Sequence, residues 1–232
     1  MAEHTGASYQ GRADAYADMV ESKPIYAYYE RPAVLSLLPP LANIAVLDAG
    51  CGNGWYTEYL LGQGASVTAI DLDFDFVRLT QARAGEQARV LQADLTKPLD
   101  FAQAGEFDIV VCSLVMHYLK AWPATLQEFH RILQPQGALI FSTHHPFNDW
   151  KISQLEDYFA FELLHDEFDC GKVSFYRRPL TMISQDLDET GFYIERLLEP
   201  QPAEALRQVD QNVYDRLNNN PWFLVVRARK KD

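Results

Sequence analysis

Short apolar runs alternate with amphipathic stretches through the middle of the chain. Runs of this length, bounded by polar residues, are typical of buried parallel strands. Strands are therefore expected at Ile44–Leu47, Val67–Ile70, Arg89–Leu91, Ile109–Cys112 and Leu139–Phe141. Helices are expected at Trp55–Leu61, Phe74–Ala84 and Trp122–Leu133. Strands that alternate with helices predict a doubly wound, mostly parallel sheet with helices on both faces.

The two ends of the chain depart from this alternation. Pro24 and Pro32 each suit the first turn of a helix, so two or three short helices are expected within the aromatic-rich residues 1–40. Two extended segments are expected on either side of Asp169-Cys170-Gly171. A helix at Pro179–Thr190, ended by Gly191, and strands at Phe192–Leu198 and Phe223–Ala228 would follow.

These elements predict one α/β domain built on a seven-stranded sheet. Its expected parts are an N-terminal helical cover (1–40), a cofactor-binding core (41–145), an inserted lid (146–178) and a C-terminal helix with strands (179–232). A chain of 232 residues with 48% hydrophobic residues is long enough to bury a substantial core.

Charge and cysteine usage narrow the class of partner. The net charge of −12 argues against a nucleic-acid partner, because phosphate contacts are made largely by Lys and Arg. Arg177-Arg178 and the cluster from Arg227 to Lys231 are interpreted as surface groups. Three widely spaced cysteines suit free thiols in a reducing compartment. Without an apolar leader or a long apolar run, the expectation is a cytoplasmic protein that does not enter a membrane.

The stretch VLDAGCGNGWYTEYL, Val46 to Leu60, contains a glycine loop between a strand and a helix. A dinucleotide fingerprint would need a glycine at position 55, where Trp55 stands. Asp48 at the end of the strand would repel a pyrophosphate and favour a cationic or hydrogen-bond-donating ligand. Asn53 is read as a residue that favours the turn.

Carboxylates also end the next two strands. Asp71 stands 21 residues after Gly50, where a carboxylate accepts the hydroxyls of a ribose. Asp94, between Ala93 and Leu95, is placed to take an adenine amino group beside an apolar wall. A ligand with adenine, ribose and positive charge but no phosphate matches S-adenosylmethionine.

At these motifs the chain resembles the class I S-adenosylmethionine-dependent methyltransferases. VLDAGCGNG, TAIDLD, LQADL and FDIVVCSLVMHYL are similar to their first four motifs, in order. The resemblance implies a Rossmann-like methyltransferase fold and S-adenosylmethionine as cofactor, with S-adenosylhomocysteine as product. The implied cofactor-binding residues are Asp48, Gly50, Cys51, Gly52, Asn53, Asp71, Leu72, Asp94, Leu95, Ser113 and Leu114. Within this set, the glycine loop would line the methionine end, and Ser113 and Leu114 would lie near the amino group of the donor.

Methyl transfer from a sulfonium needs alignment more than acid–base help, so the chain needs no evident catalytic triad. If a general base exists, the candidates are His117, His144 and His145, which follow the fourth and fifth strands. Tyr26, Tyr29 and Tyr176 are the candidate substrate contacts. No metal site is expected, since no third ligand accompanies the adjacent histidines.

Several functions stay open on these grounds. A methyltransferase acting on a small molecule is favoured. A nucleic-acid or protein methyltransferase is opposed by the acidic charge and by the segment Ser113–His117, which lacks the Asn/Asp-Pro-Pro-aromatic pattern of base-amine methylation. A non-catalytic S-adenosylmethionine-binding module would carry the same donor motifs. A dehydrogenase is disfavoured by Trp55 and Asp48.

Overall fold

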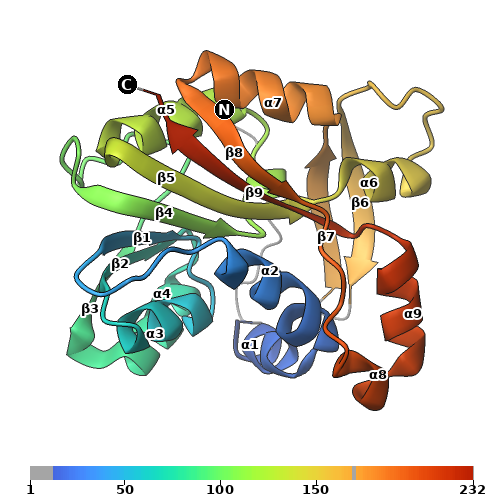
Figure 1. Cartoon of the computed structure of the whole chain (residues 1–232), viewed down its shortest axis with the longest axis horizontal. Coiled ribbons are helices and arrows are strands. Elements are labelled where there is room, and N and C mark those ends of the chain that lie inside the picture. Colours follow the sequence, from blue (N-terminus) through green and yellow to red (C-terminus); the bar gives the residue numbers. More distant parts are fainter. Residues whose placement is uncertain (1–12, 169–170, 232) are drawn as a thin grey trace.

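The computed structural model describes residues 13–168 and 171–231, in which one large sheet forms the centre (Figure 1). Its seven strands lie in the order β3-β2-β1-β4-β5-β9-β8. The strands are β1 (Ala45–Ala49), β2 (Ser66–Asp71), β3 (Ala88–Gln92), β4 (Phe107–Ser113), β5 (Leu133–His144), β8 (Phe192–Leu198) and β9 (Phe223–Lys230). Strands β1 to β5 pair in parallel, and β9 is antiparallel to both β5 and β8. The predicted mostly parallel, seven-stranded sheet is confirmed.

Helices cover both faces of this sheet (Figure 1). The helices that follow strands β1, β2 and β4 and precede β8 are α3 (Trp55–Gly62), α4 (Phe74–Ala84), α5 (Trp122–Ile132) and α7 (Leu180–Glu189). Short 3-10 turns, η2 (Gly85–Gln87) and η3 (Met116–Tyr118), follow α4 and β4. Helices α5 and α7 lie on one side of the sheet, and α3 lies on the other with the N-terminal helices.

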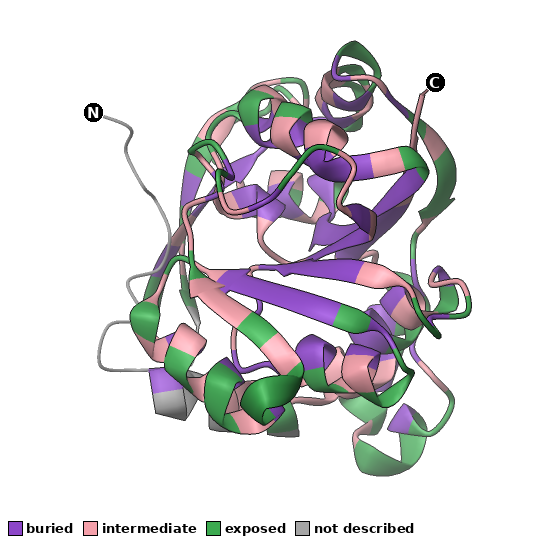
Figure 2. Ribbon diagram, turned by 90° about the vertical axis from the view of Figure 1, so that its left-hand side faces the viewer, coloured by how far each residue is buried: buried purple, intermediate pink, exposed green. Residues whose placement is uncertain are grey.

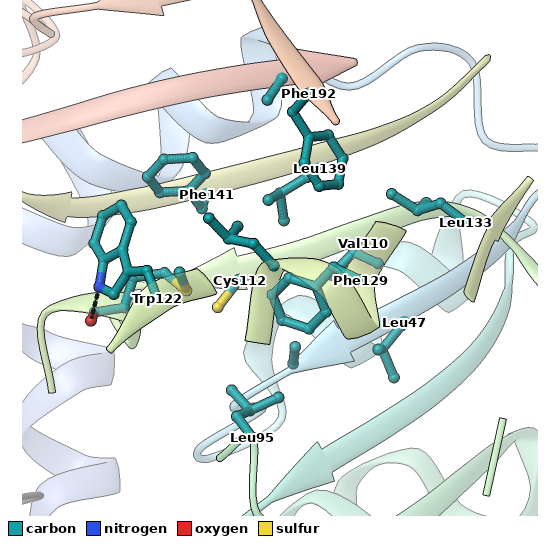
Figure 3. Packing of buried hydrophobic residues seen from close by; sticks show 14 of the residues in the cluster. Leu47, Leu95, Val110, Cys112, Trp122, Phe129, Leu133, Leu139, Phe141 and Phe192 are labelled. Carbon is teal, nitrogen blue, oxygen red and sulfur yellow. Dashed lines mark hydrogen bonds between the residues drawn. The ribbon is translucent and has the colours of Figure 1, made fainter. Parts of the chain in front are cut away.

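Two apolar clusters form the core because successive strand residues point to opposite faces. Leu47 and Val110 pack with Trp122 and Phe129 of α5 on one side (Figure 3). Their neighbours Val46 and Val111 pack on the other side, toward the N-terminal helices and α3. In Figure 2 the central strands are almost continuously buried. Strands buried on both faces explain why the sequence shows unbroken apolar runs there rather than alternation.

From Ala13 to Ser36 the N-terminal segment is mostly helical, with an irregular turn at its centre. Helix α1 (Ala13–Ser22) is followed by a π-helical turn, η1 (Tyr26–Glu30), and then by α2 (Arg31–Ser36). Pro32 has no N–H to donate to the carbonyl of Tyr28, four residues earlier. That carbonyl instead accepts a hydrogen bond from the N–H of Ala203, at 2.7 Å. The turn is thereby stabilised by contact with the C-terminal part of the chain.

After β5 the chain builds a separate unit beside the carboxyl end of the sheet. Helix α6 (Pro146–Ile152) leads to an antiparallel hairpin of β6 (Glu162–Phe168) and β7 (Gly171–Arg177). These strands correspond to the two expected extended segments, although Asp169 and Cys170 lie outside the described residues. Two further helices, α8 (Leu206–Val209) and α9 (Gln211–Asn219), precede β9.

The basic C-terminal cluster was interpreted as surface groups, and this is wrong for Arg227. It lies within β9, where its guanidinium pairs with Glu195 at 2.6 Å and donates to the carbonyl of Leu37 at 2.9 Å. Alternation along a strand turns this side chain toward a packed neighbour. Among the residues described, no helix is long and apolar enough to cross a bilayer.

Candidate functional site

The glycine loop joins β1 to α3 at the point where the sheet reverses its order. Strand β1 lies between β2 and β4, so the crevice at its carboxyl end is the switch point at which open α/β sheets bind ligands. Gly50, Gly52 and Gly54 have φ angles of 85°, 53° and 80°. A Cβ on Gly50 would lie 2.3 Å from the side chain of Val115, which follows β4. The loop backbone is thus free to lie against β4 and to face the crevice.

Asp71, at the end of β2, holds this loop by its carboxylate. Its two oxygens accept hydrogen bonds from the N–H groups of Gly52, at 2.9 Å, and Asp73, at 3.0 Å. Each carboxylate oxygen has two acceptor positions, so one on each oxygen is left for a pair of ligand hydroxyls. Burial raises the pKa of Asp71 to about 6, against the lowering effect of the backbone donors.

Asp48 is the second carboxylate at the carboxyl end of the sheet, and only 1% of it is exposed. Its Oδ2 accepts a hydrogen bond from the hydroxyl of Thr57 in α3, at 2.6 Å. Burial raises the pKa of Asp48 to about 7, and the charge of Asp71 adds to the effect. A buried carboxylate of this kind is stabilised in its charged form by a nearby cation and disfavours a phosphate.

The adenine candidates lie beyond β3. Asp94 accepts hydrogen bonds on Oδ1 from the N–H and the hydroxyl of Thr96, at 2.8 and 2.7 Å. Leu95 is buried against the α5 side of the core. Leu72, after β2, is 48% exposed. Asp94 and Leu72 therefore lie at the solvent-accessible edge of the sheet, whereas Leu95 is part of the apolar core beneath it.

The cysteines of the site are buried thiols. Cys51 accepts a hydrogen bond on sulfur from Thr80 at 3.3 Å, and burial raises its pKa well above the usual value. Cys112, in β4, is buried and its pKa is likewise raised by burial. Both sulfurs are therefore neutral near pH 7, which suits packing rather than nucleophilic attack. Within the described part of the chain, no three His, Cys, Asp or Glu side chains converge as a metal site.

Leu114, directly after β4, has a backbone conformation that is rare for leucine. Leu114 has a φ of 54°, in the left-handed region that glycine normally adopts. Its N–H donates to the carbonyl and to the hydroxyl oxygen of Ser142 in β5, both at 3.0 Å. Partly buried Ser113 precedes it. These contacts hold the strained residue beside the glycine loop.

Glu30 is a site residue that the sequence analysis did not identify. It reaches the ends of β4 and β5 from the π-helical turn, and only 1% of it is exposed. Its carboxylate accepts hydrogen bonds from the hydroxyls of Ser142 at 2.6 Å, Ser113 at 2.8 Å and Tyr56 at 2.8 Å. Burial raises the pKa of Glu30, and the three hydroxyl donors oppose that rise. A polar residue inside an aromatic helix was the one signal available in the sequence.

The N-terminal helices make further polar contacts with the glycine loop. The amide of Asn53 donates to Glu21 of α1 at 3.2 Å, and its side-chain oxygen accepts from the N–H of Trp55 at 3.3 Å. The guanidinium of Arg31 stacks on the ring of Trp55, 4.2 Å from its centre. The N-terminal segment therefore packs directly on the start of α3.

Two of the candidate bases form a stacked pair. His117 in η3 and His144 at the end of β5 stack with ring centres 3.9 Å apart. Phe175 of β7 meets both rings edge-on. Burial lowers the pKa of His117 well below its usual value, and no group within residues 13–168 and 171–231 hydrogen-bonds to its buried Nδ1. Nδ1 of His144 lies 3.4 Å from a carboxylate oxygen of Asp149 in α6.

His145 uses both of its ring nitrogens within the protein. Nδ1 accepts from the N–H of Phe147 at 3.2 Å and so caps α6. Nε2 lies 2.9 Å from Glu199. Burial lowers the pKa of His145, and Glu199 partly offsets this. These contacts suit a structural role better than that of a base.

The candidate substrate contacts occupy different environments. Tyr29 is fully buried, and its hydroxyl accepts from the N–H of Trp222 at 3.0 Å. Tyr176 is buried and stacks on Phe161 with ring centres 5.3 Å apart. Tyr26 is partly exposed. Tyr26 is thus the most accessible of the three.

The interpretation of Arg177 and Arg178 as a surface pair is wrong, because both are buried in the structure. Arg177 pairs with Glu162 at 2.7 Å across the hairpin. Arg178 lies over the ring of Trp122, 4.4 Å from its centre, and donates to the carbonyl of Leu119 at 2.9 Å. Arg178 therefore fastens the hairpin to the body of the protein, whereas Arg177 ties β7 to β6 and to the segment before it.

Comparison with known proteins agrees with this geometry. Residues 47–141 match a family model described as a methyltransferase domain. An uncharacterised protein of Haemophilus influenzae is 28% identical over 224 residues, which cover 87% of each chain. A ubiquinone biosynthesis O-methyltransferase of Thiobacillus denitrificans is 33% identical over 106 residues; the match spans 45% of this chain and 46% of that enzyme. A crystal structure of a candidate S-adenosylmethionine-dependent methyltransferase from Listeria monocytogenes is 25% identical, with a TM-score of 0.76, covering 88% of this chain and 97% of that one.

The doubly wound sheet, with its glycine loop and carboxylates at the ends of β1 and β2, defines a class of nucleoside-binding α/β proteins. The matched domain and the fold support a class I S-adenosylmethionine-dependent methyltransferase. Members of this class are enzymes, and their cofactor is S-adenosylmethionine. The match spans about half the length of the O-methyltransferase named above.

Proposed function

We propose that this chain catalyses transfer of a methyl group from S-adenosylmethionine to a small-molecule acceptor by in-line displacement. The observation that carries the proposal is a pair of carboxylates, the buried Asp48 and the partly buried Asp71, beside a glycine loop at the switch point of the sheet. Two negative groups there favour a cationic adenosine compound over a pyrophosphate. The donor, when bound, supplies an activated methyl group on a sulfonium.

The described residues fit such a donor. Asp71 has one acceptor position left on each oxygen, which matches the two hydroxyls of a ribose. Asp94 and Leu95 would take the adenine at the neighbouring strand. Since β2 and β3 then carry the adenosine, the amino-acid part of the donor falls in the crevice between β1 and β4, lined by the glycine loop and Leu114.

On the acceptor side, we propose His144 as the residue that removes a proton where the acceptor needs to lose one. Asp149, at 3.4 Å, would orient the imidazole and stabilise its protonated form. His117 stacks on it as a neutral ring and would limit its movement. His145 is the weakest of the three candidate bases, because both of its nitrogens are engaged. The main contribution of the protein would be alignment and exclusion of water.

A small acceptor agrees with the charge of the chain and with the name of one relative. The net charge of −12 disfavours a nucleic acid. The relative from Thiobacillus denitrificans is named for O-methylation in ubiquinone biosynthesis. We therefore propose a small-molecule acceptor for this chain and name no particular compound. Tyr26 would contact the acceptor from the N-terminal cover, and residues 146–178 would border it as a lid.

Two experiments test the proposal. Titration calorimetry should show binding of S-adenosylmethionine and S-adenosylhomocysteine and none of nicotinamide dinucleotides; a preference for the dinucleotides would overturn the choice of donor. A screen of phenols, carboxylic acids, amines and thiols, read as formation of S-adenosylhomocysteine, should then give a methylated product. Donor binding with no product from any acceptor would favour a non-catalytic binding module. Product only with RNA, DNA or protein would favour the macromolecular alternative.

A further inference from the structure

The carboxylate of Glu30 joins three elements that border the donor crevice. Ser113 ends β4, Ser142 lies in β5, and Tyr56 belongs to α3, directly after the glycine loop. All three hydroxyls donate to one buried side chain from the N-terminal segment. Removing a buried acceptor of this kind leaves several donors without a partner, which is costly.

The route from Glu30 to the crevice runs through Ser142. Its hydroxyl donates to Glu30 at 2.6 Å and accepts from the N–H of Leu114 at 3.0 Å. Leu114 has a φ of 54°, which a leucine keeps only when its surroundings hold it there. Because the hydroxyl of Ser142 donates its hydrogen to Glu30, the lone pairs of the Ser142 oxygen are left to accept from the N–H of Leu114. Glu30 therefore orients the hydroxyl that holds the strained backbone.

The local helix geometry brings Glu30 to this position. It is the last residue of the π-helical turn, immediately before Arg31 and Pro32. A π turn contains one extra residue, which shifts the direction of the side chains that follow. Pro32 cannot donate to the carbonyl of Tyr28, and this carbonyl accepts a hydrogen bond from the N–H of Ala203 instead. The irregular turn is thus held from both sides, as is common for helical irregularities at functional sites.

We propose that Glu30 is a positioning residue for the amino-acid part of the donor. It holds the end of β4, and through Ser142 the backbone of Leu114, in the form that receives this part of the ligand. This inference rests on the proposed function. Specifically, Glu30 would affect binding on the β1–β4 side of the crevice and leave binding of the adenosine part, at Asp71 and Asp94, unchanged.

The test compares three ligands by titration calorimetry with the full chain. S-adenosylmethionine and S-adenosylhomocysteine carry the amino-acid part, whereas 5′-methylthioadenosine has adenine, ribose and sulfur without it. For Glu30→Gln we expect at least about a five-fold loss of affinity for the first two, within the range of coupling between linked sites. Affinity for 5′-methylthioadenosine should stay within about two-fold of that of the parent chain.

A second pair of variants covers a failure of Glu30→Gln to fold. Tyr56→Phe removes one hydrogen bond to Glu30, and Tyr59→Phe removes a hydroxyl from the same helix, where Tyr59 stacks on Trp55. The first should reproduce the selective loss in part, and the second should not. Equal weakening of all three ligands, or unchanged affinity in both Glu30→Gln and Tyr56→Phe, would overturn the inference. Failure of the parent chain to bind any of the three would instead overturn the proposed function.

Discussion

Replacing Asp71 by asparagine is the sharpest perturbation of the donor site, because the two side chains have the same shape. The carboxylate accepts one backbone N–H on each oxygen and would accept one ribose hydroxyl on each. Asparagine keeps a single acceptor oxygen and carries no charge. At least one charged hydrogen bond to the ribose is lost, at a cost of about 1.5–3 kcal/mol. The dissociation constant for S-adenosylhomocysteine should therefore rise roughly 10- to 150-fold.

The assay is titration calorimetry at pH 8, where Asp71, with a pKa of about 6, is ionised. Asp73→Asn is the matched control. Asp73 lies two residues away and caps α4 by accepting from the N–H of Asp75 at 2.8 Å. Asparagine caps a helix about as well as aspartate, so the control should keep both its stability and its affinity for the ligand. A folded Asp71→Asn variant that binds S-adenosylhomocysteine as tightly as the parent chain would refute the ribose assignment.

Three further predictions follow from the same site. The pKa of Asp48 rises from 3.8 to about 7 in the folded chain, which then binds a proton that the unfolded chain has released between these values. The free energy of unfolding should accordingly fall as pH rises through that window, by up to about 1.4 kcal/mol per pH unit, and urea titrations of Asp48→Asn should show a flatter slope; an unchanged slope would contradict the assignment. Gly50→Ala should lose donor binding and at least about 1–3 kcal/mol of stability in calorimetry and melting experiments, because its φ is 85° and the new Cβ would clash with Val115. The control Gly62→Ala should be close to neutral in the same experiments, because nothing lies within 4 Å of its Cβ. Once an acceptor is found, His144→Asn should lower kcat by roughly 10²–10⁴-fold and Asp149→Asn by less, with donor affinity unchanged; full activity of both variants would remove the proposed base.

The donor side of the site could be read from the sequence because its residues follow strands directly. Asp48 and Asp71 stand at the ends of unbroken apolar runs, and parallel strands bring such ends to one edge of the sheet. Glycines with positive φ are likewise local features of the chain. The alternation of strand and helix was enough to predict a doubly wound, mostly parallel sheet. The division of the chain at 40, 145 and 178 stays a prediction.

The contacts made over long sequence distances could not be read in this way. Glu30 and Ser142 are 112 residues apart, and no periodicity connects them. Arg177 and Arg178 were interpreted as surface groups because they are charged. The sequence does not show that the carbonyl of Tyr158 and the ring of Trp122 lie next to them in the fold. Sequence alone also gave His145 equal standing with His144; the cap on α6 that separates them is a tertiary feature.

Helices α6, α8 and α9 were not predicted either. Helix α8 has four residues and α6 seven, too few for a clear helical period. Helix α9 has nine residues with Asp210 as its N-cap, a local signal that the sequence analysis passed over. Strand β5 was predicted only at its three central apolar residues, although it runs from Leu133 to His144. The pairing of β5 with β4 is irregular between Leu133 and Ala138, and the polar residues there show no apolar run from which a strand could be predicted.

A crystal structure with S-adenosylhomocysteine bound is the most direct measurement of the central claim. The account predicts both ribose oxygens within about 2.5–3.0 Å of the carboxylate oxygens of Asp71, with the amino-acid part between the glycine loop and Leu114. A ligand bound elsewhere on the chain, or a ribose held by groups other than Asp71 while that carboxylate faces away, would contradict it.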